Sequence, residues 1–404
     1  MVNRSSASTS NVGPNSTVVL LGTSDTKRAE IEFIEQQLHH LSCNCCFVDM
    51  ALDSQLSTAP DHKTQLMKRK AAEIEHLVQE RYADCSGVAF LAIGGGVGSW
   101  IAISVLKSLP LGLGKVLVST FPYDLRPDVA FSDIVLIPSI TDIQGLNPIL
   151  RTALRRGALI AACLAQQETV NEMERPIVAI TGLGVTQGAV RCCQELLQAK
   201  GFEVATFHAN GIGSRALEHL IQTGAFSAVI DLTTHELNGI LFGSVDVAED
   251  DRLRNASERG VPQVVCPGAL DILTRGSSEP LSEEEQGRPH YRHSPKFTHV
   301  RTTPQEMRHS ALSLVERLRG NHGPCAVLIP QGGFSSADQP GSPMWCPEAT
   351  AEFVATLRAE LPESIELLEL PDHINSPGFG SAVVTKLLSF IPNSIPNLWT
   401  QQNC

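Results

Sequence analysis

The chain has little positive charge and no long apolar run. Its 404 residues include 31 Lys and Arg against 43 Asp and Glu, which gives a formal net charge of −12. Because it also has no long Lys/Arg cluster, we expect no nucleic-acid partner. No uninterrupted apolar segment is long enough to cross a bilayer, so we expect no membrane span. The first residues lack the basic region and apolar core of a signal peptide, which leaves a cytoplasmic location as the expectation.

Three familiar motifs of α/β proteins are missing. The chain has no P-loop ending in Gly-Lys-Ser/Thr and no Gly-x-Ser-x-Gly nucleophile elbow. The dinucleotide fingerprint is also incomplete. Gly182, Gly184 and Gly188 come nearest to it, but the strand expected after them ends in His208 rather than in an acid. A P-loop NTPase, an elbow-type serine hydrolase and a Rossmann dehydrogenase therefore have no support.

Short apolar runs alternate with helical patterns from end to end, which is typical of a parallel sheet with helices on both faces. We expect strands at 18–21, 47–50, 88–93, 115–120 and 134–138 in the first half of the chain. In the second half we expect them at 177–181, 204–207, 228–232, 263–266, 326–329 and 365–370.

The chain is too long for one ordinary core, so more than one domain is expected. The predicted fold class is α/β, with two Rossmann-like subdomains that each hold a doubly wound, mainly parallel sheet. Their expected bounds are 17–168 and 176–395, between a disordered N-terminus (1–16) and a tail (396–404). The long charged stretch 276–294 is expected to be a functional or disordered loop.

Two loops of the first half combine a strand end with a helix start, and they hold the candidate ligand-binding residues. The first amides of a helix have no internal partner and suit a phosphate or carboxylate. A cation in the first turn, as at Lys27, opposes the helix dipole and is explained by a nearby anion, while Asp25 could hold a bridging Mg²⁺. The alternative is that both loops are turns and caps without a ligand. The candidates are Thr23, Ser24, Asp25, Lys27, Gly94, Gly95, Gly96 and Ser99.

Acid/base candidates follow the strand ends of the second half. His208 and Glu236 follow the ends of apolar runs, and His293 lies in the long charged stretch. Because the carboxyl ends of such strands open onto one edge, these three could converge and act as catalytic acid and base. The alternative is that each one hydrogen-bonds a loop backbone. His290, His293 and His299 could form a metal site, but a flexible loop gives them no fixed geometry, so no metal is expected.

Further segments, taken together, resemble a known family in order from residue 18 to about 392. It is the family of the ATP-binding N-terminal region of the plant tobamovirus-resistance protein, with bacterial and fungal relatives. The resemblance implies two Rossmann-like subdomains, a homodimer, and a nucleotide (ATP, with Mg²⁺) held mainly by the first subdomain. Arg301 lies in a matching segment and is counted as ligand-binding on that ground. The segments are 22–27, 94–99, 132–133, 141–147, 207–216, 267–271, 291–303, 347–349 and 372–375.

The chain also departs from the family pattern around the first glycine loop. Val97 replaces a glycine there, and Phe121 and Tyr123 stand where the family has small residues. Three functions remain open. The first is binding of a nucleotide or other anionic small molecule. The second is an enzyme (hydrolase, C–C lyase or isomerase) acting on an oxygenated carbonyl or carboxylate metabolite, with ATP binding lost. The third is a protein-interaction or inhibitor module.

Overall fold

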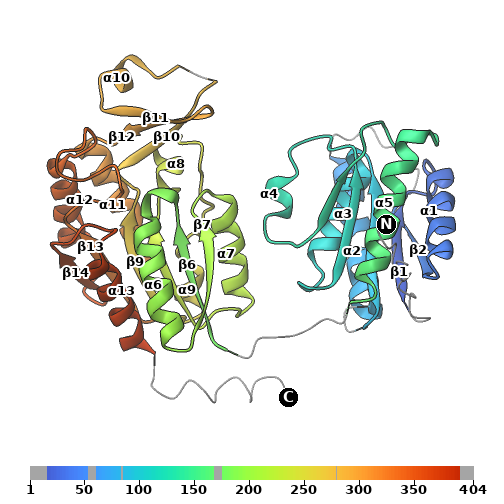
Figure 1. Cartoon of the computed structure of the whole chain (residues 1–404), viewed down its shortest axis with the longest axis horizontal. Coiled ribbons are helices and arrows are strands. Elements are labelled where there is room, and N and C mark those ends of the chain that lie inside the picture. The colour runs from blue at the N-terminus through green and yellow to red at the C-terminus, as the bar shows by residue number, and fades with distance from the viewer. Residues whose placement is uncertain (1–15, 53–60, 83–84, 168–174, 279, 392–404) are drawn as a thin grey trace, which may run out of the picture. The chain divides into compact units, whose positions relative to one another are not determined.

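The computed structural model describes residues 16–52, 61–82, 85–167, 175–278 and 280–391. Its internal contacts divide the chain into two compact units, Met1–Glu172 and Met173–Cys404, and each is described by itself (Figure 1). Residues 1–15 of the expected disordered N-terminus, the expected tail and most of the segment between the two expected subdomains lie outside the described residues.

The first unit holds a five-stranded parallel sheet in the order β2-β1-β3-β4-β5. Helices α1 and α5 pack on one face, and α2 and α3 on the other. Both faces are therefore covered, which is why these strands are short apolar runs. The strands are β1 (Thr17–Gly22), β2 (Asn44–Asp49), β3 (Val88–Gly94), β4 (Gly114–Ser119) and β5 (Val135–Pro138). The helices are α1 (Arg28–His40), α2 (His62–Tyr82), α3 (Gly96–Lys107), α4 (Arg126–Val129) and α5 (Pro148–Leu164).

The second unit repeats this plan with a six-stranded parallel sheet in the order β14-β13-β9-β8-β6-β7. Helices α6 and α13 cover one face, and α7, α11 and α12 cover the other. Its strands are β6 (Ile177–Gly182), β7 (Glu203–His208), β8 (Ala228–Thr233), β9 (Gln263–Gly268), β13 (Cys325–Pro330) and β14 (Glu366–Leu370). Its helices are η1 (Gly184–Thr186), α6 (Gln187–Ala199), α7 (Ile212–Gln222), α8 (Leu237–Phe242), α9 (Asn255–Glu258), α11 (Pro304–Leu318), α12 (Pro347–Glu360) and α13 (Pro377–Phe390). Two mainly parallel sheets flanked by helices are the predicted fold class.

A small antiparallel sheet lies at one end of the second unit (Figure 1). It consists of β10 (Ile272–Gly276), β12 (Phe297–Arg301) and β11 (His290–Ser294), in that order across the sheet. The expectation that 276–294 has no regular structure is wrong, because β11 and α10 (Glu283–Gln286) lie within it. Ion pairs order this charged stretch: Arg275 pairs with Glu285, and Arg288 with Glu306.

Candidate functional site

A cavity of about 220 Å³ opens in the second unit at the carboxyl ends of the main-sheet strands. Strand β6 pairs with β7 on one side and with β8 on the other, so the strand order reverses there. Ligands of open α/β sheets bind at such a switch point. The turns after β6, β7 and β8 all contribute to the lining, and the small antiparallel sheet adds residues from β10, β11 and β12.

One wall of this cavity is apolar. Leu183 and Val185 come from the turn that leads into α6, Ala269 and Ile272 come from the connection between β9 and β10, and Phe297 begins β12. Val185, Ala269 and Ile272 belong to one buried apolar cluster. This wall gives a ligand a surface for apolar contact but no charge.

The polar side of the cavity carries four histidines, His208, His235, His293 and His299, together with Asp246. The predicted acid/base residues His208 and His293 thus line one cavity, although one ends β7 and the other lies in β11. Neither ring makes a hydrogen bond within the described part of the chain, so both are available to a ligand. Their catalytic role stays a prediction.

His235 is the most firmly held of the four imidazoles. It is 1% exposed. Its Nδ1 lies 2.9 Å from the carbonyl oxygen of Ala269, and its Nε2 lies 2.9 Å from Thr274 Oγ1 and 3.5 Å from Asp246 Oδ2. Since a carbonyl oxygen accepts only, Nδ1 carries the proton. Burial opposes the charged imidazole, but Asp246 and the Ala269 carbonyl outweigh that effect and raise the pKa of His235.

His299 has the opposite electrostatic environment. Burial, together with the neighbouring His293 and His235, lowers the pKa of its imidazole to about 4. Its ring stacks on that of His293 with centroids 4.3 Å apart, and its Nδ1 lies 2.9 Å from the Tyr291 hydroxyl. At neutral pH His299 is therefore an uncharged partner at the cavity wall.

A close backbone approach holds Asp246 in place. Gly211, in the turn after β7, has φ +78°, and a Cβ there would lie 2.3 Å from the carbonyl oxygen of Val247. A Cβ at Gly239 would lie 2.0 Å from the carbonyl oxygen of Asp246. Glycine is therefore required at both positions. These contacts fix the segment that carries Asp246 against the turn that carries His208.

Glu236, the third predicted acid/base residue, does not line this cavity. Its side chain is fully buried, and its Oε1 accepts from Arg252 Nε at 2.6 Å. Arg252 also pairs with Glu218 and Asp231, and all four side chains are at most 2% exposed. The sequence placed Glu236 correctly after β8 but did not show that its side chain joins this buried ion cluster.

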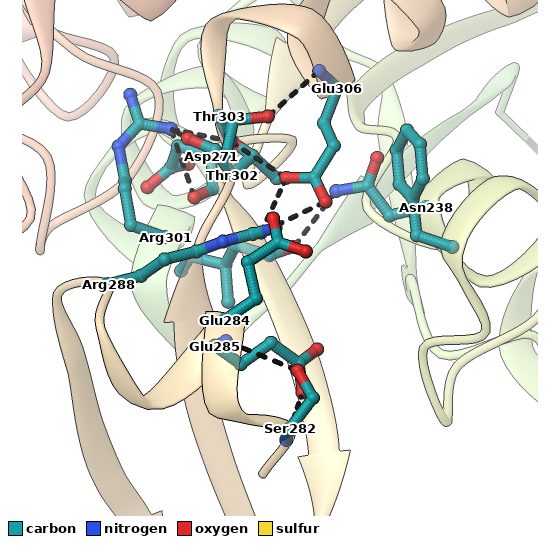
Figure 2. A network of polar contacts seen from close by, with 12 residues as sticks. Asn238, Asp271, Ser282, Glu284, Glu285, Arg288, Arg301, Thr302, Thr303 and Glu306 are labelled. Carbon is teal, nitrogen blue, oxygen red and sulfur yellow. Dashed lines mark hydrogen bonds and ion pairs between the residues drawn. The ribbon is translucent and has the colours of Figure 1, made fainter.

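Arg301 is likewise turned inward. Its guanidinium is 3% exposed. Nε donates to the carbonyl of Met344 at 2.8 Å, Nη1 to that of Asp271 at 3.1 Å, and Nη2 to that of Cys346 at 3.4 Å. Figure 2 shows it beside Asp271 and Thr302, in a network that continues through Arg288. Arg301 therefore joins two loops to the small sheet and does not line the cavity.

In the first unit, the predicted residues of the loop after β1 bond mainly to the protein. The ammonium of Lys27 donates to the carbonyl of Ile143 at 2.6 Å, and Thr23 Oγ1 lies 2.8 Å from that of Thr26. Ser24 donates to Asp49 through both its amide and its hydroxyl. Asp25, which is exposed, accepts a 3.3 Å bond from Thr26.

The glycine loop after β3 lies beside the corresponding reversal of strand order, between β1 and β3. Gly94 is required by the fold, because a Cβ there would lie 2.5 Å from the backbone of Gly98 and Ser99. Gly95 and Gly96 have more room: the nearest atom to a Cβ at Gly95 is 3.9 Å away, and none lies within 4 Å at Gly96. Ser99 is buried, with its hydroxyl 2.8 Å from that of Ser119 and bonded to the carbonyl of Gly94.

Two family models match this chain. Residues 53–170 match the N-terminal domain, and residues 175–391 the C-terminal domain, of the uncharacterised protein family UPF0261. The chain belongs to the UPF0261 family. The resemblance expected from its motifs is thereby confirmed at the level of family membership, because the tobamovirus-resistance protein is among the relatives. ATP binding, the homodimer and the cytoplasmic location stay predictions.

Relatives of this UPF0261 chain include bacterial proteins and a plant protein. A UPF0261 protein of Clostridium tetani is 30% identical over 93% of this chain and 99% of its own length. One of Rhizobium meliloti is 36% identical over 74% of this chain and 76% of its own length. The ToMV resistance protein Tm-1(GCR237) of Solanum lycopersicum is 31% identical over 75% of this chain, which corresponds to 42% of the tomato protein.

Several site residues of this UPF0261 chain escaped the sequence analysis. Asp246 lies in an irregular segment without any motif, and His299 was considered only as a metal ligand. His235 also follows a strand end, but the strand-end argument selects only the adjacent Glu236 of this pair as an acid/base candidate. Within the described ranges, no group of three His, Cys, Asp or Glu side chains is placed to hold a metal ion. No described helix is both long and apolar enough to span a bilayer.

Proposed function

We propose that the second unit binds a small oxygenated metabolite in its histidine-lined cavity and exchanges protons with it through His208 and His293. The observation that carries this proposal is the convergence of two imidazoles from distant segments on one cavity, with ring nitrogens that no described protein group occupies. A satisfied structural histidine has its nitrogens hydrogen-bonded, as His235 does. His208 and His293 are not held in this way.

The dimensions and polarity of the cavity support a small ligand. Its volume of about 220 Å³ is below the range of about 300–1,000 Å³ that is usual for drug-sized ligands. Gly184, in the turn after β6, lines it and has no atom within 4 Å of the place of a Cβ. The backbone amides of Gly184 and Val185 begin this helical turn, and we propose that they stabilise negative charge that develops on an oxygen.

The chemistry that fits this arrangement is proton transfer. An uncharged imidazole takes a proton from a carbon or oxygen of the bound metabolite, and a second imidazole returns one elsewhere. His235, held by Asp246, keeps the cavity wall in one geometry. Isomerisation, C–C cleavage and hydrolysis all need such transfers, so this site supports the enzyme hypothesis at the level of acid/base catalysis.

The test follows proton exchange. The full chain is incubated in D₂O with small carbonyl compounds, from acetoin and pyruvate to acetophenone, and NMR follows the loss of protons next to the carbonyl group. We expect catalysed exchange with at least one compound. His208→Ala and His293→Ala should each slow it about 10²- to 10⁴-fold. His39→Ala, an exposed histidine of the first unit, is the control. Exchange no faster than in buffer for every compound, or unchanged in both variants, would contradict the proposal.

A second candidate function concerns the first unit, for which we propose a nucleotide or other anion beside the glycine loop after β3. The observation that favours it is the open space at Gly95 and Gly96, where neither packing nor a positive φ requires glycine. Calorimetric titration with ATP, with and without Mg²⁺, tests this proposal. Gly96→Val should abolish binding while the melting temperature stays close to that of the wild type. Equal affinity of the variant and the wild type would show that this loop is a turn without a ligand.

A further inference from the structure

The charge around the histidine-lined cavity restricts the kind of molecule that it can take. Asp246 brings a carboxylate to the lining, and its side chain is 23% exposed. None of the lining residues, all of which belong to the described part of the chain, is Lys or Arg. The cationic side chains of the small sheet bond elsewhere: Arg275 to Glu285, Arg292 to the carbonyl of Pro295, and Arg301 to that of Met344.

Sites that select carboxylates or phosphates are usually built differently. They supply Arg, which contacts the anion in a bidentate manner, or Lys, which contacts it as a point charge. A site that carries negative charge itself disfavours an anionic ligand. An anion in this cavity would meet a carboxylate and no permanently charged cation. His235, whose pKa is raised, already has protein partners at both ring nitrogens, so it offers no free cationic donor to an anion.

The polar groups of the cavity that remain available suit an uncharged acceptor. Asn210 accepts from the amide of Gly213 through Oδ1 at 3.0 Å, which leaves its Nδ2 group as a donor. His208 and His293 can each donate through one ring nitrogen. Leu183, Val185 and Phe297 add apolar surface to the same lining. A ligand that has a carbonyl oxygen and a hydrocarbon part matches this combination of hydrogen-bond donors and apolar surface.

We propose that this cavity selects an uncharged carbonyl compound with an apolar side, and that Asp246 is the residue that excludes its carboxylate and phosphate analogues. This inference rests on the proposed function of the cavity and adds the class of substrate. It separates the second unit from a nucleotide site, because a nucleotide carries the charge that Asp246 repels.

Matched pairs of probes test the inference. Acetoin and lactate have nearly the same shape, but lactate has a carboxylate where acetoin has a methyl ketone; acetophenone and benzoate form a larger pair of the same kind. Binding of each to the full chain is measured by ligand-observed NMR at about pH 8, above the ordinary range of imidazole titration. We expect the uncharged member of at least one pair to bind about tenfold more tightly, or better.

Asp246→Asn removes the charge and keeps the shape of the side chain. It should reduce or reverse the preference by strengthening the binding of lactate or benzoate. Glu360→Gln removes an exposed charge at the end of α12 and should leave the preference unchanged. If the anions bind as tightly as their uncharged partners, or if Asp246→Asn leaves the ratio unchanged, this inference is overturned while the proposed site survives. If none of the four probes binds, the proposed site is overturned together with it.

Discussion

Replacing Arg252 with methionine removes the guanidinium that three buried carboxylates share. Arg252 Nε lies 2.6 Å from Glu236 Oε1, and Nη1 lies 3.1 Å from Glu218 Oε1 and 2.5 Å from Asp231 Oδ1. The four groups join α7, β8, the start of α8 and the segment before α9. Methionine fills much of the same volume, so the main effect is the loss of the charge. The variant therefore leaves three acids in the core without their cation.

The expected loss of stability is large. Breaking a buried ion pair costs about 3–5 kcal/mol, whereas an exposed pair is worth about 0–1 kcal/mol. In a unit of this size, 1 kcal/mol corresponds to about 2–4 °C, so the melting temperature of the second unit should fall by about 6–20 °C. Arg358→Met is the matched control, because Arg358 is 61% exposed and pairs with Glu369 at the surface. Its melting temperature should change by no more than a few degrees.

The pH dependence gives an independent check. Carboxylates buried without a partner have raised pKa values, and protonation relieves their cost. The difference between Arg252→Met and the wild type should therefore be smaller at about pH 5 than at about pH 7.5. Hydrogen exchange of peptides from β8 and β9 in the full chain reports on the second unit alone. If the variant melts within about 2 °C of the wild type at neutral pH, the guanidinium of Arg252 does not stabilise the second unit as expected.

Three further predictions follow from the same contacts. Burial raises the pKa of Glu218 to about 7, above its ordinary value of 4.5, so the folded state holds a proton that the unfolded chain releases between these values. Wild-type stability should fall as pH rises through that window, and urea unfolding of Glu218→Gln should show a weaker fall. Imidazole NMR should find His299 uncharged down to about pH 5, and His293→Ala should raise the pKa of His299, because a neighbouring charge is removed. Gly94→Ala should destabilise the first unit by about 1–3 kcal/mol, whereas Gly96→Ala should leave its melting temperature nearly unchanged, because only the first Cβ meets backbone atoms.

Local sequence was sufficient for the main sheets. The strand at 88–94 is buried along its whole length, and its unbroken apolar run reflects that burial. The small antiparallel sheet was missed because ion pairs and strand pairing order this charged stretch, and β11 has no continuous apolar run. Arg288 reaches Glu306, and β12 pairs with both β10 and β11. In the sequence alone, charged residues that form ion pairs cannot be distinguished from charged residues of a solvated loop.

The candidate site was predictable in part for the same reason. Topology brings strand ends to one edge, so His208 could be placed there without knowledge of its contacts. Glu236 also follows a strand, but its side chain turns to Arg252, and position along the chain does not show that direction. Asp246 is fixed by close backbone contacts at Gly211 and Gly239, which no local pattern signals.

If the histidine-lined cavity of the second unit is a small-molecule site, a bound ligand should perturb the imidazoles that line it. Histidine-selective ¹⁵N labelling of the full chain detects this perturbation by NMR. The compound titrated into the labelled protein is the one of acetoin, acetophenone, lactate and benzoate that most raises the melting temperature. We expect the imidazole signals of His208, His235, His293 and His299 to shift together along one binding curve, while that of His39 does not move. If a bound compound leaves those four signals unmoved, or if none of the four compounds binds, the cavity is not a site for these small molecules.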